Sequence, residues 1–101
     1  MRVIAGDLGG RTIQSPKGST IRPTSDRVRE AIFNTLFSMG ALENARVLDL
    51  FAGTGALGIE ALSRGAAHCS FVDRDPDAIA LIEANLAALG IEDRATVVRS
   101  D

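Results

Sequence analysis

The sequence predicts an α/β protein with three parallel strands, preceded by a β-hairpin and a helix. Three observations support this prediction: short apolar runs alternate with helix-like patterns, a glycine-rich stretch follows the first run, and each helix-like pattern ends at a glycine. Of the 101 residues, 46% are hydrophobic and 24% are charged. These values are typical of one globular domain and do not indicate a disordered chain.

A strand that leads into a glycine loop and then a helix organises the chain. Val47–Leu50 is an apolar run of the kind found in strands covered on both faces. Residues 56–64 then carry apolar side chains at helical spacing. Gly53 and Gly55 lie between them, where they permit unusual backbone conformations and a close approach to a ligand. The stretch therefore predicts a cofactor-binding loop.

The charge of Asp49 favours one kind of cofactor over another. Gly53, Gly55 and Gly58 match the dinucleotide fingerprint, with Asp73 about 20 residues after the first glycine. Asp49, however, ends the strand at the sheet edge where such folds bind ligands. Its carboxylate would repel a pyrophosphate and attract the ammonium and sulfonium groups of S-adenosylmethionine. A dinucleotide-dependent oxidoreductase and a glycine turn used only for packing remain alternatives.

Two more strands with helices between them follow the same pattern. We predict a helix from about residue 26 to Gly40, a second strand at Ser70–Asp73, a helix that begins at Asp75-Pro76, and a third strand at Ala95–Arg99. Asp75 is expected to cap its helix. The residues expected to be buried in the first helix are Val28, Ile32, Phe33, Leu36, Phe37 and Met39.

Right-handed crossovers place the second strand beside the first and the third beyond it. Asp49, Asp73 and Asp101 then lie at one carboxyl edge, where they could face the amino-acid end, the ribose and the adenine of an adenosyl ligand. The single cysteine, Cys69, is expected to be buried rather than nucleophilic, and its lack of a partner fits a reducing compartment. His68 is expected at the surface, and no ligand cluster supports a metal site.

The charge is distributed unevenly along the chain. Residues 1–29 hold six basic and two acidic side chains, a net charge of +4, whereas residues 30–101 have a net charge of −6. This asymmetry predicts a basic arm that contacts RNA phosphates next to an acidic body. The arm begins with a hairpin around residues 6–10 that has few large apolar groups and therefore needs a body to dock on. It is either a solvated cap or a surface that presents basic residues to RNA.

Three stretches together resemble a known family. They are Arg2-Val3-Ile4-Ala5-Gly6 with Gly10-Arg11, Arg22-Pro23-Thr24-Ser25-Asp26-Arg27-Val28-Arg29-Glu30-Ala31-Ile32-Phe33-Asn34, and Asp49-Leu50-Phe51-Ala52-Gly53-Thr54-Gly55. The chain resembles the RsmD-type bacterial methyltransferases of small-subunit ribosomal RNA, which modify the exocyclic N2 of a guanine. They belong to the class I S-adenosylmethionine-dependent methyltransferases, which have a Rossmann-like fold.

The resemblance implies two sets of site residues. The cofactor-binding set is Arg22, Pro23, Thr24, Asp49, Phe51, Ala52, Gly53, Thr54, Gly55, Asp73, Arg74 and Asp101. The RNA-binding set is Arg2, Arg11, Lys17, Arg22 and Arg27. The implied partner is small-subunit ribosomal RNA or its ribonucleoprotein particle. We expect a cytoplasmic protein without a membrane segment, monomeric at full length.

The family's catalytic Asn/Asp-Pro-Pro-Phe/Tyr motif is missing. The three prolines, Pro16, Pro23 and Pro76, are not adjacent, so we expect no catalytic residue in this chain. We therefore predict an arm at residues 1–24 and an incomplete cofactor-binding domain at residues 25–101, without its C-terminal half and inactive alone. The open edge of the first strand is consistent with this hypothesis. A non-catalytic RNA-binding module remains the other alternative.

Overall fold

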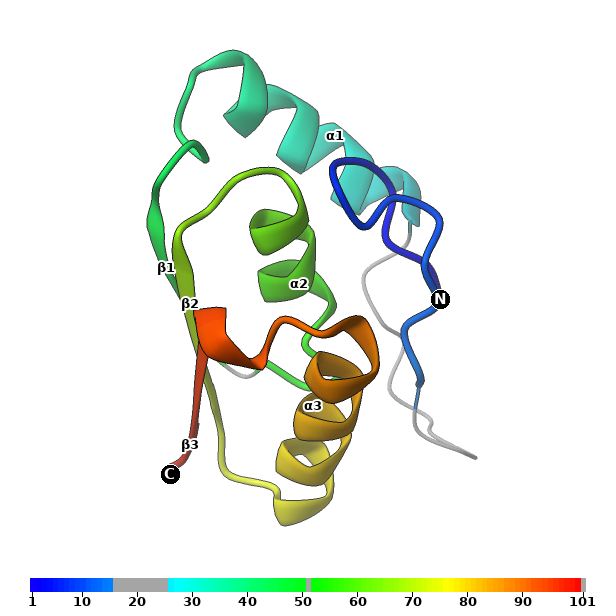
Figure 1. Cartoon of the computed structure of the whole chain (residues 1–101), viewed down its shortest axis with the longest axis vertical. Coiled ribbons are helices and arrows are strands. Elements are labelled where there is room, and N and C mark those ends of the chain that lie inside the picture. Colours follow the sequence, from blue (N-terminus) through cyan, green and yellow to red (C-terminus); the bar gives the residue numbers. More distant parts are fainter. Residues whose placement is uncertain (16–25, 51, 101) are drawn as a thin grey trace.

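The computed structural model describes residues 1–15, 26–50 and 52–100 and confirms the α/β Rossmann-like class (Figure 1). The elements are α1 (Asp26–Ser38), β1 (Arg46–Leu50), α2 (Ala56–Ser63), β2 (His68–Asp73), α3 (Pro76–Leu89), the short 3-10 helix η1 (Glu92–Arg94) and β3 (Ala95–Arg99). They follow the predicted order. No helix in these described ranges has the length and apolar character needed to cross a membrane.

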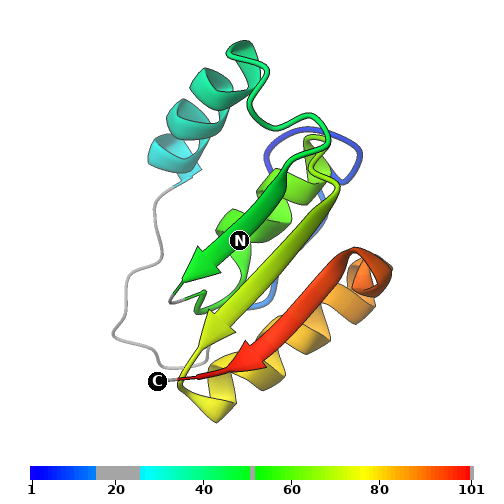
Figure 2. The same cartoon turned by 90° about the vertical axis from the view of Figure 1, so that its left-hand side faces the viewer.

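The three strands form a parallel sheet in the order β1-β2-β3, as predicted. Asp49 lies opposite Phe71, which in turn lies opposite Val97. Helices α2 and α3 pack on the same face of the sheet (Figure 2). Because side chains alternate along a strand, these three residues belong to the face that the helices cover.

The other face of the sheet is not covered by any described helix (Figure 2). Leu48 and Leu50 point to this face and are 62% and 57% exposed. The prediction that Val47–Leu50 is covered on both faces is therefore wrong for the described part of the chain. An apolar run reveals that a strand can be buried on both sides, but a second layer is needed to bury it.

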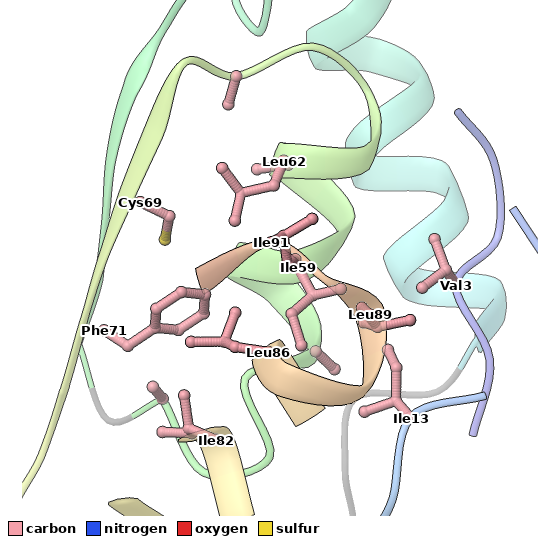
Figure 3. Close-up of a cluster of buried hydrophobic side chains, with 14 of the residues drawn as sticks. Val3, Ile13, Ile59, Leu62, Cys69, Phe71, Ile82, Leu86, Leu89 and Ile91 are labelled. Carbon is pink, nitrogen blue, oxygen red and sulfur yellow. The ribbon is translucent and has the colours of Figure 1, made fainter. Parts of the chain in front are cut away.

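The core lies between the sheet and the helices (Figure 3). Phe71 from β2 is fully buried, as are Ile59 and Leu62 from α2 and Ile82 from α3. Cys69 is also fully buried, as predicted. Burial from water of side chains that meet from several elements is the main favourable contribution to the stability of such a fold.

The buried face of α1 differs from the predicted one. Arg29 and Phe33 are buried and Leu36 is half-buried, and this side of the helix faces α2. The predicted core residues that are instead exposed are Val28 (50%), Ile32 (47%), Phe37 (61%) and Met39 (72%). Apolar residues at helical spacing occur on more than one side of α1, and tertiary contacts rather than spacing selected the side that is buried.

The predicted hairpin is present as a short antiparallel pairing. Arg2 forms a bridge with Thr12, and the Val3 amide donates a hydrogen bond to the Arg11 carbonyl over 2.9 Å. Val3 and Ile13 are each only 1% exposed and belong to the main core, so the hairpin is docked on the body. Figure 1 shows the hairpin beside α1 and the helices that cover the sheet.

Two side chains of α2 hold this hairpin through its backbone. Glu60, which is fully buried, accepts hydrogen bonds from the amides of Ile4 (2.9 Å) and Ala5 (3.1 Å). Ser63 donates to the Ala5 carbonyl over 2.6 Å and accepts from the Leu8 amide over 2.9 Å. The hairpin therefore satisfies its backbone groups on α2.

Candidate cofactor-binding site

The loop after β1 has the conformation for which its glycines are needed. Gly53 has φ 59° and Gly55 has φ 82°, both in the left-handed region that other residues rarely adopt. The Ala52 amide continues the pairing with β2 by donating to the Val72 carbonyl over 3.0 Å. The loop then turns at the carboxyl edge of the sheet and enters α2 directly.

Asp73, at the end of β2, connects this loop to the neighbouring strand. Its Oδ2 accepts a hydrogen bond from the Gly53 amide over 3.0 Å, and its Oδ1 accepts from the Asp75 amide over 2.9 Å. Burial opposes ionisation of this carboxyl, but hydrogen bonds from the backbone of Asp75, Gly53 and Arg74 and the charge of Arg74 lower its pKa overall. Asp73 is therefore ionised near neutral pH, and its oxygens retain lone pairs for further donors.

Asp75 has the separate role that the sequence predicts. Its side chain accepts a hydrogen bond from the Asp77 amide over 2.9 Å and caps the N-terminus of α3. Pro76 follows at the first helical position, where its missing N–H has no cost. The two acids near the end of β2 thus differ: Asp75 stabilises a helix, whereas Asp73 contacts the glycine loop.

Asp49 lies beneath the loop, on the covered face of the sheet. It is 8% exposed, and its Oδ2 accepts a hydrogen bond from the Gly58 amide over 3.2 Å. Burial raises the pKa of Asp49 to about 6; the hydrogen bond from Gly58 opposes this rise, and the negative charge of Asp73 adds to it. The carboxylate occupies the positive end of the α2 dipole.

Gly58 allows α2 to approach the sheet closely. A Cβ at this position would lie 2.3 Å from Cε1 of Phe71 and 2.6 Å from Sγ of Cys69. The third glycine of the fingerprint therefore serves helix–strand packing, which leaves Gly53 and Gly55 as the glycines of the loop itself. Burial of the Cys69 thiol, together with the charge of Asp49, raises the pKa of Cys69 to about 12, so the thiol is not a nucleophile at neutral pH.

The remaining predicted site residues divide into two groups. Ala52 is buried, Thr54 is half-buried and Arg74 is exposed, all beside the loop or the end of β2. Arg2, Arg11 and Arg27 are exposed, and the Arg11 guanidinium donates to the Ala88 carbonyl over 3.1 Å. The predicted residues that lie outside the described ranges are Lys17, Arg22, Pro23, Thr24, Phe51 and Asp101.

Sequence reasoning missed Asn85, a buried polar residue of α3 next to the loop. It is 2% exposed, and its side-chain amide donates to the Thr54 carbonyl over 3.1 Å. The available signal was its position between Ile82 and Leu89, on the apolar stripe of the helix. A polar residue on such a stripe indicates a specific buried partner.

His68 is the first residue of β2. His68 is half-buried at the start of β2, and its Nε2 lies 3.0 Å from Oγ1 of Thr96. The expectation of a surface residue is thus only partly met, because the side chain is half-buried and contacts Thr96 on the neighbouring strand. Within the described residues, no three His, Cys, Asp or Glu side chains are grouped so as to hold a metal ion.

Comparison with known proteins identifies the family. A family model described as conserved hypothetical protein 95 matches residues 1–101. The chain belongs to this family. It is 50% identical over 101 residues to a protein named putative rRNA methyltransferase YlbH from Bacillus subtilis (strain 168), covering 100% of this chain and 54% of that relative. It is 44% identical over 89 residues to ribosomal RNA small subunit methyltransferase D from Escherichia coli (strain K12), covering 88% of this chain and 44% of that relative.

Solved structures of methyltransferases are also similar to this chain. A putative methyltransferase yhhF from Escherichia coli matches with a TM-score of 0.87 and 44% identity, over 100% of this chain and 53% of that one. A putative methylase from Haemophilus influenzae matches with a TM-score of 0.74 and 36% identity, over 99% of this chain and 51% of that one. The RsmD-type assignment from sequence is confirmed. The chain spans about half the length of the curated relatives it matches.

Proposed function

We propose that this chain supplies the S-adenosylmethionine-binding half of an enzyme that methylates the exocyclic N2 of a guanine in small-subunit ribosomal RNA in the cytoplasm. Two relatives carry names that specify ribosomal RNA methylation. S-adenosylmethionine supplies an already activated methyl group, so the protein's main task is to hold the cofactor and the base in line.

The hydrogen bond between Asp49 and Gly58 is the observation that carries the choice of cofactor. In dinucleotide-binding folds, the N-terminus of the helix after the glycine loop receives the pyrophosphate. Here a carboxylate already accepts from the third amide of α2. A second anion would be placed next to this charge, whereas a cationic ligand would be attracted. This argues against the dinucleotide-dependent oxidoreductase.

The residues around the loop can be assigned roles toward an adenosyl ligand. Asp73 is ionised and lies at the loop, so it is suited to accept hydrogen bonds from the ribose hydroxyls. Asp49 provides the negative potential for the charged amino-acid end. The residues proposed to line or cover the remaining pocket are Arg22, Pro23, Thr24, Phe51, Ala52, Gly53, Thr54, Gly55, Arg74 and Asp101.

The basic N-terminal arm is proposed to contact RNA phosphates. Arg2, Arg11 and Arg27 are exposed in the described part of the chain, and Lys17 and Arg22 complete the set by sequence. Phosphate contacts of this kind supply affinity without base specificity. The methyl-accepting site, by contrast, is proposed to lie in the portion of the longer relatives that this chain does not span. The proposed division is an arm at residues 1–24 and a cofactor-binding domain from residue 25.

Calorimetry with S-adenosylmethionine, S-adenosylhomocysteine and NAD tests the cofactor assignment. We expect the first two to bind and to raise the melting temperature of this chain, with no effect of NAD. Asp73→Asn, with the exposed acid Asp93→Asn as a matched control, should weaken binding by about tenfold because a ribose acceptor is changed. Binding of NAD alone would support the oxidoreductase instead.

Methyl transfer to RNA tests the substrate. The chain joined to the remaining half of a family member should methylate small-subunit ribosomal RNA, and a transcript with inosine in place of guanosine should accept no methyl group, because inosine lacks the N2 amine. The 101-residue chain alone should bind cofactor without transferring the methyl group. Transfer by this chain alone would contradict the proposed division, and no transfer by the joined protein would favour a non-catalytic RNA-binding module.

A further inference from the structure

Asn85 joins two parts of the molecule that are distant in sequence. Its Oδ1 accepts a hydrogen bond from the Gln14 amide over 2.8 Å, and its Nδ2 donates to the Gln14 carbonyl and the Thr54 carbonyl, each over 3.1 Å. The side chain therefore pairs with the amide and the carbonyl of Gln14 in the hairpin and with a carbonyl of the glycine loop. It does so while only 2% exposed.

The two segments that Asn85 joins carry different proposed tasks. Thr54 lies between the two loop glycines of the candidate cofactor site. Gln14 follows Ile13, the buried anchor of the hairpin that also presents Arg11. A second contact connects the same two parts, because Oγ1 of Thr54 lies 3.9 Å from Sδ of Met1. Met1 thus contacts the loop directly, whereas Gln14 is connected to it through the side chain of Asn85.

Asn85 is a polar residue at a buried position, and its hydrogen-bond partners are what make an asparagine suitable there. Its neighbours on the buried stripe of α3 are apolar, among them Ile82, Leu86 and Leu89. A leucine at position 85 would suit such a stripe, whereas a buried amide is costly unless its donors and acceptor are satisfied. The backbone groups of Gln14 and Thr54 satisfy it. Loosening either segment therefore leaves polar groups of the buried Asn85 side chain without a partner.

We propose that Asn85 is a positioning residue that couples the RNA-contacting hairpin to the cofactor loop. Ordering of the loop by an adenosyl ligand strengthens the docking of the hairpin, and a docked hairpin raises cofactor affinity by the same factor, because binding linkage is reciprocal. This inference rests on the proposed function for the identity of the ligand. The coupling itself is a property of the ligand-free chain.

Amide hydrogen exchange on this chain without ligand tests the coupling directly. Gln14→Pro removes the donor to Oδ1 and leaves the Asn85–Thr54 hydrogen bond in place. We expect this change to accelerate exchange of the Gly55 and Ala56 amides by about fivefold, although neither contacts residue 14. Ser63→Ala is the matched control, because it loosens the hairpin at Ala5 and Leu8 only. Unchanged exchange at Gly55 and Ala56 in Gln14→Pro would overturn the proposal.

Addition of S-adenosylhomocysteine tests the direction toward the ligand. In the wild type it should slow exchange at Gly55 and also at Ile13 and Gln14, by about tenfold. In Asn85→Ala the slowing should persist at Gly55 and disappear at Ile13, whose amide keeps its acceptor, the Met1 carbonyl. Ligand affinity should fall about tenfold, an effect that Ser63→Ala should not share. Equal slowing of Ile13 in Asn85→Ala would contradict the coupling. Absence of slowing at Gly55 in the wild type would instead reject the cofactor assignment, and the ligand-free comparison would still decide the coupling.

Discussion

Gly58 and Phe71 are in such close contact that no side chain fits between them. A Cβ at Gly58 would lie 2.3 Å from Cε1 and 2.7 Å from Cζ of the Phe71 ring. The ring is fully buried in the core, so it cannot make room without displacing other core side chains. This contact sets how closely α2 approaches the sheet, and thereby places the Gly58 amide within hydrogen-bond distance of Asp49.

We therefore expect Gly58→Ala to destabilise the chain by about 2 kcal/mol. In an exposed helix the same change would stabilise by about 1 kcal/mol, so helix propensity and packing predict opposite signs. Denaturant unfolding measures the result. Phe71→Leu should recover part of the loss when combined with Gly58→Ala, since it makes room at the contact. Equal stability of Gly58→Ala and wild type would show that α2 can move away from β2 without cost.

The stability of the chain should depend on pH through Asp49. Its pKa is raised from 3.8 to about 6 in the folded state, so between these values the folded chain binds more protons than the unfolded chain. The contribution of Asp49 to the free energy of unfolding consequently falls as pH rises from about 4 to 6, by about 3 kcal/mol. Asp49→Asn should lack this dependence. Unfolding curves of both proteins across this range measure the difference, and identical pH profiles would contradict the assignment.

Cofactor binding should show the opposite dependence on pH. The proposed attraction requires the Asp49 carboxylate in its ionised form, so affinity for S-adenosylmethionine should increase as pH rises through about 6 and then level off. Asp49→Asn should bind about tenfold more weakly at neutral pH with a flat profile. S-adenosylhomocysteine lacks the sulfonium charge and should lose less affinity in this variant. Calorimetry at several pH values measures the affinity for both ligands. An equal loss of affinity for both would show that Asp49 does not act through the sulfonium charge.

We expect the docking of the hairpin to depend on the negative charge of Glu60 more than on any other charge. It is fully buried, 2.8 Å from Nε of Arg64 and 3.9 Å from Nε of Arg29, and it also accepts from two hairpin amides. Glu60→Gln removes the negative charge that faces these two arginines and should cost about 3 kcal/mol of unfolding free energy. The exposed Glu83→Gln on α3 is the matched control and should change stability little. Urea unfolding measures both, and a small effect of Glu60→Gln would show that the two arginines are compensated elsewhere.

The arm should bind RNA in a salt-dependent manner. Neutralising Arg11 and Lys17 should reduce the slope of log affinity against log salt concentration by about one for each phosphate that these side chains neutralise. Arg46→Gln is a suitable control, because Arg46 is exposed at the amino end of β1, away from the hairpin. Filter binding of small-subunit ribosomal RNA at several salt concentrations measures the slope. An unchanged slope in the arm variants would show that the arm is not part of the RNA interface.

Local patterns in the sequence were sufficient for the elements and the loop. The order of strands and helices, the cap at Asp75, the left-handed Gly53 and Gly55 and the burial of Cys69 all follow from residues that are neighbours in the chain or repeat at a fixed period. Such features depend on backbone preferences and spacing, which a sequence states directly.

Tertiary structure alone decided which faces are buried and which polar groups meet. Glu60 holds Ile4 across 56 positions of the chain, and Asn85 holds Gln14 across 71. Spacing within α1 could not show that Phe33 rather than Phe37 faces α2, because both lie on apolar sides of one helix. The sequence by itself determined the parts and the family, because these depend on local pattern. The environment of Asp49 and the joining of the hairpin to the loop were decided by contacts between distant segments, which no local pattern encodes.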